Sequence, residues 1–347
     1  MANNQRPPVY YSEYLQLDKI LDAQAPESTK EGKMANDEML FIIIHQTYEL
    51  WFKQILHELN IVRGIFSQPI IQDNTPDIYN SVHRLKRISS ILEVAVMQMG
   101  VLETMTPLDF LDFRDLLRPA SGFQSIQFKM IEGALGLRYD QRYGKAYYLS
   151  ALKPADVERV KSIEHEQSLL ALINVWLERM PFVKDTEYWK HNDTGTFWKE
   201  YRQAYADSLT EGEQHNLLIF DKIFIDDNNY PADRSFSADA SRNALFIMLY
   251  RDHPLLQLPY ELLNILLEID EQLSMWRHRH IHMVQRTIGK RVGTGGSSGG
   301  EYLRGAADSH YVFKELSELT SFLLPRMLLP VLPVKVISAL SYGQNNG

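Results

Sequence analysis

The chain has 347 residues, of which 36 are Lys or Arg and 44 are Asp or Glu, so its formal charge is −8 at pH 7. This acidic balance argues against a duplex nucleic-acid binder, which needs a basic surface. The 45% of hydrophobic and 23% of charged residues are an ordinary mixture for a globular protein. No cysteine is present, which excludes disulfides, zinc–thiolate sites, iron–sulfur clusters and a cysteine nucleophile.

Membrane association is not predicted. The N-terminal stretch has no apolar signal-peptide core, and no run of about 18 apolar residues occurs. The most apolar stretch, residues 322–340, contains Arg326 and Lys335 and is interrupted by three prolines. We interpret it as a buried or subunit-contacting surface. We therefore expect a cytoplasmic protein that binds neither a membrane nor nucleic acid.

The first 140 residues have a helical apolar pattern. From Asn36, apolar side chains recur at steps of three and four, with Asn36 as N-cap and two acidic residues that suit the positive end of the helix dipole. Thr106-Pro107 predicts a capped helix start, and Pro119 predicts its end. Two further helices are expected over 78–100 and 123–135.

The remaining sequence is also helical in pattern. Residues 140–235 are more polar and richer in Tyr and Trp, and the stretch 226–239 predicts a loop. No strand-like alternation longer than a few residues and no solenoid repeat is visible, so the fold class is all-α, in a single domain of residues 1–347. The expected helices are 154–179, 195–224, 241–250, 259–288 (opened by Pro259) and one from about Glu301.

Two histidines lie on apolar helix faces. His45 shares a face with Phe41 and Tyr48. His280 continues an apolar stripe of the long helix, and a neutral imidazole in an apolar core is typical of an axial haem ligand. A core histidine satisfied by one hydrogen bond is the alternative for His45. The stripe consists of Leu262, Ile265, Leu266, Ile269, Leu273 and Trp276.

His278 and His282 flank His280 but point elsewhere, because two residues rotate a helix by about 200°. Their spacing of four could hold a metal, yet no HExxH motif and no third ligand at metal spacing accompany them. A solvated basic helix end is the alternative.

Three loops or termini carry other candidate groups. The glycine-rich residues 293–299 are not preceded by a strand, as a nucleophile elbow would be, and they lack the Walker pattern of a phosphate loop. They therefore form either a loop whose backbone can approach a ligand closely or a linker. An arginine beside an aromatic ring, as Arg114 is beside Phe110, can bind a carboxylate at the edge of an apolar pocket. The alternative is that Arg114 is a surface arginine that makes a capping or rim contact. Tyr11 and Tyr14 belong to an aromatic arm that packs on a neighbouring subunit or acts as a hydrophobic staple.

Taken together, these segments resemble the tryptophan 2,3-dioxygenase family. The similarity runs in order from about residue 10 to about residue 325 and is weakest across 140–235, a more variable helical insertion. The segments that carry it are YSEYLQLDKIL, NDEMLFIIIHQTYELWFKQILHEL, TPLDFLDFRDLLRPASGFQSIQF, WRHRHIHMVQRTIGKRVGTGGSSG and EYLRGAA. One departure is visible: the family often has His-Asp-Glu where this chain has Asn36-Asp37-Glu38, and Asn serves equally as a cap.

The resemblance implies a haem b enzyme that inserts both atoms of O2 across the indole C2–C3 bond of L-tryptophan, the first step of tryptophan degradation by the kynurenine pathway, and yields N-formylkynurenine. It also implies a homotetramer, a dimer of dimers, in which the N-terminal arm, residues 1–30, contacts a neighbouring subunit. Within the matched motifs, His280 corresponds to the proximal haem ligand and His45 to the distal histidine that accepts a hydrogen bond from the indole N–H.

The same motifs imply the remaining site residues. Arg114 corresponds to the arginine that pairs with the substrate carboxylate, and Thr294 to the threonine that binds the substrate ammonium and carboxylate. The resemblance also places Trp276 close to the proximal side. Positions that line the substrate or the distal haem face are Phe41, Phe110, Tyr11, Tyr14, Leu117, Ser121 and Gly122.

Two other functions remain open from the sequence. A member of the family whose outcome has drifted, such as a mono-oxygenase on a substituted tryptophan, would alter the set of Phe41, His45, Arg114 and Thr294, which here is intact. A non-enzymatic haem sensor would need His280 but neither Arg114 nor Thr294.

Overall fold

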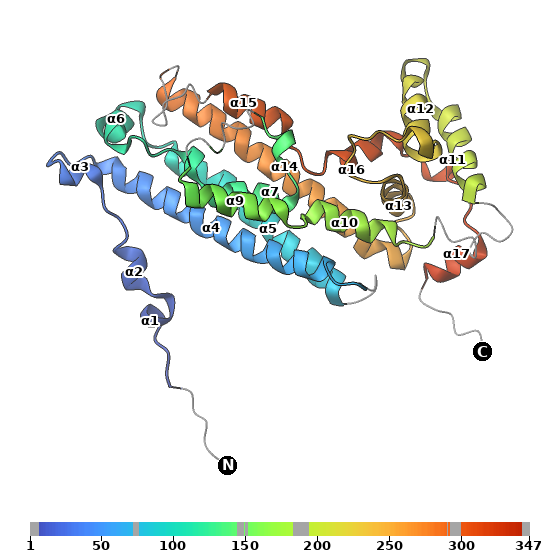
Figure 1. Ribbon diagram of the computed structural model, residues 1–347, viewed down its shortest axis with the longest axis horizontal. Coiled ribbons are helices and arrows are strands. Elements are labelled where there is room, and N and C mark those ends of the chain that lie inside the picture. The colour runs from blue at the N-terminus through green and yellow to red at the C-terminus, as the bar shows by residue number, and fades with distance from the viewer. Residues whose placement is uncertain are drawn as a thin grey trace, which may run out of the picture.

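A computed structural model describes residues 7–71, 76–143, 149, 152–182, 194–289, 291 and 300–341. Regular structure within these residues is helical throughout, which confirms the all-α prediction. Three long helices run along the longest axis of the molecule (Figure 1): α4 (Asn36–Phe66), α5 (Pro76–Leu102) and α14 (Pro254–Ile288). α5 packs against both α4 and α14, so these helices form the centre of the fold.

The first long helix, α4, buries the apolar face that the sequence predicts, including Ile44, Phe52 and Ile55. Its N-cap is Ala35, so the prediction that Asn36 caps the helix is wrong by one position. The carboxylate of Glu38 instead accepts hydrogen bonds from the backbone N–H groups of Glu27 and Ser28, at 2.8 and 2.9 Å. This buried carboxylate fixes α3 (Glu27–Lys30) across the start of α4.

The third long helix, α14, begins at Pro254 rather than at Pro259, which corrects the predicted start. Pro254 occupies the first helical turn, where a missing N–H costs nothing. Pro259 lies inside the helix and is buried. Its ring removes one backbone hydrogen bond, and the burial of the stripe from Leu262 to Leu273 outweighs that loss.

Shorter elements close one end of the bundle, where α4 begins and α5 and α14 end (Figure 1). Thr106 caps α6 (Pro107–Phe113) in a capping box with Asp109, as the sequence predicts. The chain then tightens into η1 (Arg114–Leu117) and η2 (Gly122–Gln124), and α7 (Ile126–Leu135) starts three residues later than expected.

The opposite end holds α10 to α13, α16 and α17 (Figure 1). The predicted helix over 154–179 is two helices, because Ser168 caps a new start after the break at 166–168. The remaining elements are α1 (Tyr11–Leu15), α2 (Leu17–Leu21), η3 (Tyr139–Gln141), α9 (Pro154–His165), α10 (Leu169–Glu178), α11 (Thr194–Ser208), η4 (Glu211–Glu213), α12 (His215–Phe220), η5 (Asp221–Ile225), η6 (Asp227–Asn229), α13 (Ala238–Leu249), α15 (Gly300–Ser309), α16 (Lys314–Glu318), η7 (Leu319–Phe322), η8 (Arg326–Leu328) and α17 (Val334–Ala339).

Apolar surface remains exposed at both ends of the described chain. Tyr11 and Tyr14 on α1 are 75% and 76% exposed. In the C-terminal stretch, Leu332 and Val336 are buried, whereas Val331 is 90% exposed. No single helix in the described part of the chain is both long and apolar enough to cross a membrane, although α5 and the segment Pro107–Leu117, bent by 88°, meet that criterion as a pair.

Candidate active site

A cavity of about 830 Å³ lies at the end of the bundle where α4 begins and α5 and α14 end. Its walls are mainly apolar and come from α4, α6, the 117–125 segment, α7, α14 and α15. We refer to it as the chamber. The predicted site residues that line it are Phe41, His45, Phe110, Arg114, Leu117, Ser121, Gly122, Trp276 and His280.

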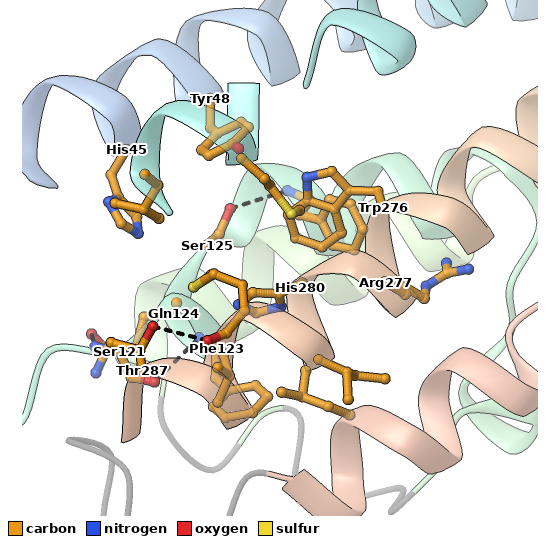
Figure 2. A pocket seen from close by; sticks show the side chains of 18 of the residues that line it. His45, Tyr48, Ser121, Phe123, Gln124, Ser125, Trp276, Arg277, His280 and Thr287 are labelled. Carbon is orange, nitrogen blue, oxygen red and sulfur yellow. Dashed lines mark hydrogen bonds between the residues drawn. The ribbon is translucent and has the colours of Figure 1, made fainter. Parts of the chain in front are cut away.

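His45 projects into the chamber from α4 (Figure 2), and the backbone sets its tautomer. Nδ1 of His45 lies 2.7 Å from the carbonyl oxygen of Phe41. A carbonyl only accepts, so Nδ1 carries the proton and Nε2 keeps its lone pair. Burial lowers the pKa of His45 despite the hydrogen bond to Phe41 and the charge of Glu49. His45 is therefore a neutral hydrogen-bond acceptor at pH 7.

His280 faces the chamber from α14, while His278 and His282 are exposed, as the apolar stripe predicts. Burial, with a smaller effect of His45, lowers the pKa of His280 to about 4, so its ring is neutral at pH 7. Its Nδ1 is buried and makes no hydrogen bond with any residue that the structure describes. Nδ1 of His280 therefore contributes no hydrogen bond to the described protein core.

Aromatic rings form two walls of the chamber. The Phe41 ring lies 4.1 Å from the His45 ring and 5.8 Å from the Phe110 ring, measured between centroids. In the second group, Trp276 lies 5.2 Å from His280 and stacks on Phe128 at 4.6 Å. Such contacts fix ring orientation as well as burying area. The chamber is thus shaped for flat ligands.

Arg114 lines the chamber at the point where α6 gives way to η1, and its side chain is 5% exposed. The following segment is organised by its own serines: the Ser121 hydroxyl accepts from the Phe123 N–H, and the Ser125 hydroxyl accepts from the Phe128 N–H (Figure 2). A side chain at Gly122 would meet no atom within 4 Å, because Gly122 faces open space in the chamber.

Two predicted site residues do not line the chamber, and a third lies outside the part of the chain that the structure describes. Tyr11 and Tyr14 lie on α1, exposed and outside the residues that line it. Thr294 lies outside the described residues. The described part of the chain contains no group of three His, Asp or Glu residues arranged to hold a metal ion, and the ring of His278 bonds to the Ser274 carbonyl at 2.9 Å.

Sequence reasoning missed a buried charged cluster in the wall of the chamber, which we call the Glu132 hub: Glu132, Arg142, Arg277 and His310. Glu132 binds Arg277 at 2.7 Å and Arg142 at 2.6 Å, and His310 Nδ1 lies 3.5 Å from it. Burial would raise the pKa of Glu132, but the hydrogen bond from His310 and the two arginine charges hold it well below its usual value. A signal existed, because Glu132 lies four residues after Phe128 on the buried face of α7.

Lys129, one turn before Glu132, is a second missed residue. It lines the chamber, is 7% exposed, and donates a hydrogen bond to the Phe123 carbonyl at 2.5 Å. Burial lowers the pKa of Lys129 to about 8, although the nearby Glu132 charge opposes this. At pH 7 the ammonium is still charged.

The fold and the chamber define a class: an all-helical protein with a buried, mainly apolar ligand chamber that presents two uncharged imidazoles. A family model described as tryptophan 2,3-dioxygenase matches residues 2–323. The chain therefore belongs to the tryptophan 2,3-dioxygenase family.

Similarity to individual proteins supports the same family. A protein named tryptophan 2,3-dioxygenase from Bdellovibrio bacteriovorus is 41% identical over 97% of this chain and 99% of its own length. Proteins of the same name from Dictyostelium discoideum and Xenopus laevis are 41% and 40% identical, over 99% and 92% of this chain and 90% and 83% of their own lengths.

Proposed function

We propose that the protein is a haem-dependent dioxygenase that inserts both atoms of O2 across the indole C2–C3 bond of L-tryptophan and forms N-formylkynurenine, the first step of tryptophan degradation. The observation that carries the proposal is the pair of neutral histidines in the chamber, in a chain that belongs to this family. His280 on α14 is the proposed axial ligand, and His45 on α4 faces the substrate.

The residues of the chamber fit haem b. His280 is neutral and its Nδ1 has no hydrogen-bond partner in the described chain, so the ring is available as a ligand. Pockets for one ligand measure roughly 300–1,000 Å³, and the chamber, at about 830 Å³, lies in the upper part of that range, where a large macrocycle belongs. Leu117, Ser121, Gly122 and Trp276 would contact the macrocycle. When bound, haem supplies the activation of O2.

His45 and Phe41 orient the indole in this proposal. Nε2 of His45 holds a free lone pair, because the Phe41 carbonyl takes the Nδ1 proton. That nitrogen can accept a hydrogen bond from the indole N–H, and the Phe41 ring can pack on the indole face. His45 does not take the proton, because the pKa of an indole N–H lies far above 7.

Arg114 binds the other end of the substrate in this proposal. Its planar, positively charged guanidinium fork suits a carboxylate. Phe110, on the preceding turn, keeps this end of the chamber apolar. Thr294 is proposed to bind the ammonium and carboxylate. A substrate without a carboxylate would lack this ion pair, which gives selectivity for an amino acid.

Turnover of L-tryptophan by the reduced holoenzyme in the presence of O2 tests the proposal, with N-formylkynurenine followed by its absorbance. His280→Ala should abolish haem binding, and the exposed neighbours His278→Ala and His282→Ala are matched controls that should keep the haem spectrum. A singly oxygenated tryptophan would indicate a mono-oxygenase. Haem binding without product would indicate a sensor or carrier, and either result would overturn the proposal.

The same proposal includes a cytoplasmic homotetramer, a dimer of dimers, in which Tyr11 and Tyr14 of residues 1–30 complete the pocket of a neighbouring subunit. The exposure of these tyrosines supports it, because large apolar side chains grouped on a surface mark interaction sites. Cell fractionation tests the location. We also propose that residues 1–347 form one domain, with 140–235 as a helical insertion.

A further inference from the structure

α7 carries two buried charges of opposite sign that line the chamber, Lys129 and Glu132. They are three residues apart, which places them on neighbouring positions of one helix face. Burying either charge costs free energy unless it is paired or hydrogen-bonded. Each of them contacts a different wall of the chamber, so α7 connects the two walls.

Lys129 holds the wall formed by residues 121–125. Its ammonium donates to the Phe123 carbonyl across 2.5 Å, and no carboxylate of the described chain lies within ion-pair distance of it. An apolar side chain would fill this position without the cost of a buried charge. The ammonium therefore serves to fix the backbone between Ser121 and Ser125, which lines the chamber next to Gly122.

Glu132 holds the wall formed by α14. It binds Arg277, three residues before His280, and the same guanidinium donates to the His310 carbonyl at 2.8 Å. Figure 2 shows Arg277 extending from α14 in a different direction from His280. Because the Arg277 guanidinium is held from two sides, the turn of α14 that carries His280 can neither rotate about the helix axis nor slide along it.

The Glu132 end of this connection is itself anchored. Arg142 donates to Glu132 and to Glu164 of α9, and also to the backbone carbonyl of Lys129 at 3.2 Å. The Tyr143 N–H donates to Nε2 of His310 at 2.9 Å. α7 is thus tied to α9 and to the end of α15, so it forms a fixed reference for both walls of the chamber.

We propose that α7 is a brace that sets the width of the chamber, with Lys129 and Glu132 as positioning residues that hold the 121–125 segment and the His280 turn at a fixed separation. The inference rests on the proposed function for its haem readout. Its geometric part concerns the chain alone and is independent of haem.

The geometric part is tested on full-length, haem-free protein by electron paramagnetic resonance. The chain has no cysteine, so Arg118→Cys and Arg286→Cys, both at exposed positions, place one spin label beside each wall without background. Lys129→Met and Glu132→Gln in this labelled background should broaden the distribution of distances between the labels. Glu58→Gln is the matched control, because Glu58 is 1% exposed and also bridges two arginines, Arg84 and Arg87.

The second readout is haem release to excess apomyoglobin at pH 7, on otherwise unlabelled protein. Groups that hydrogen-bond directly to a metal ligand change metal affinity by about 10–100-fold when mutated. Lys129 and Glu132 act on His280 only through the surrounding chain, so each brace variant should release haem faster by up to about tenfold, the lower end of that range, and Glu58→Gln should match wild type. Lys129→Met removes a buried charge, so it keeps the chain folded even if Glu132→Gln does not.

Two results separate the possible failures. Distance distributions and haem release that are the same in Lys129→Met as in Glu58→Gln would overturn the brace and leave α7 as ordinary packing. A wild-type protein that binds no haem would overturn the proposed function, while the label distances would still decide the brace.

Discussion

Arg114 and His45 bind opposite ends of the proposed substrate, and their loss has unequal consequences. Arg114→Ala leaves a carboxylate buried without its partner, which costs about 3–5 kcal/mol in a dry site. Because each tenfold change in an equilibrium or rate ratio corresponds to about 1.4 kcal/mol, kcat/KM should fall at least a hundredfold. His45→Ala removes one neutral hydrogen bond, worth about 0.5–1.5 kcal/mol, so the loss should be about tenfold or less. Steady-state kinetics at equal haem content measures both.

The control for this ranking is 1-methyltryptophan, which lacks the N–H that His45 would accept. It should react slowly with wild type and at a similar rate with His45→Ala. If His45→Ala is the more damaging substitution, and the methylated substrate is inert with both proteins, His45 takes a proton and does not merely orient the indole.

Lys129 gives a pH dependence of stability with a defined sign. Its pKa is about 8 in the folded chain and 10.5 in the unfolded reference, so between these values the unfolded chain binds more protons. Stability attributable to this group therefore rises with pH, by up to about 1.4 kcal/mol per unit. Glu132 and Arg142 are the charged neighbours, and both stay ionised over this range. The stability of wild type minus that of Lys129→Met should increase between pH 8 and 10 in urea titrations; a constant difference would contradict the shift.

Some residues of the site could be predicted from the sequence, and others could not. The apolar stripe of α14 places His280 inward from local periodicity alone, because six preceding residues share its phase. In the Glu132 hub, only Glu132 has a local signal, its position on the buried face of α7. Its partners have none, since Glu132 and His310 are 178 positions apart and the members meet only through packing of distant segments. The tautomer of His45 likewise depends on the Phe41 carbonyl, one turn earlier, and on its distance.

At the scale of elements, the capped start of α6 matters because this short helix carries Phe110 and leads directly to Arg114. The Thr106 hydroxyl accepts from the Asp109 N–H, and Asp109 accepts in return from the Thr106 N–H at 2.9 Å. Thr106→Ala should lower the free energy of unfolding by about 1 kcal/mol. Thr104→Ala is the control, since that exposed hydroxyl donates to the Val101 carbonyl in the last turn of α5 and accepts from no N–H group at a helix start. Equal urea midpoints for the two variants would contradict a stabilising cap.

Helix existence was predictable for most of the chain, whereas several helix ends were not. Pro107 and Pro254 both open helices, but Pro259 does not, because tertiary burial tolerates one missing hydrogen bond. The break at residues 166–168 has no glycine or proline to mark it; Ser168 resembles any other serine until its hydroxyl accepts from the Ala171 N–H.

At the scale of the whole molecule, exposed apolar surface predicts assembly. Tyr11, Tyr14 and Val331 are each at least 75% exposed, and burying such surface is a main driving force for association. For the proposed homotetramer, light scattering should give a mass of four times 40.3 kDa at micromolar concentration. Tyr11→Ala should lower kcat/KM if this arm reaches a neighbour's pocket. A monomer mass would remove the basis for that role.

The position of Trp276 next to Phe128 and His280 allows haem binding to be followed by the fluorescence of the protein itself. Its indole lies 5.2 Å from the imidazole, and an excited indole this close to a coloured macrocycle loses its energy to that macrocycle before it can emit. Titrating the haem-free chain with haem should therefore extinguish the component of its fluorescence that comes from Trp276. Trp276→Phe should lack that component from the start, and emission from the other four tryptophans would report only longer-range transfer.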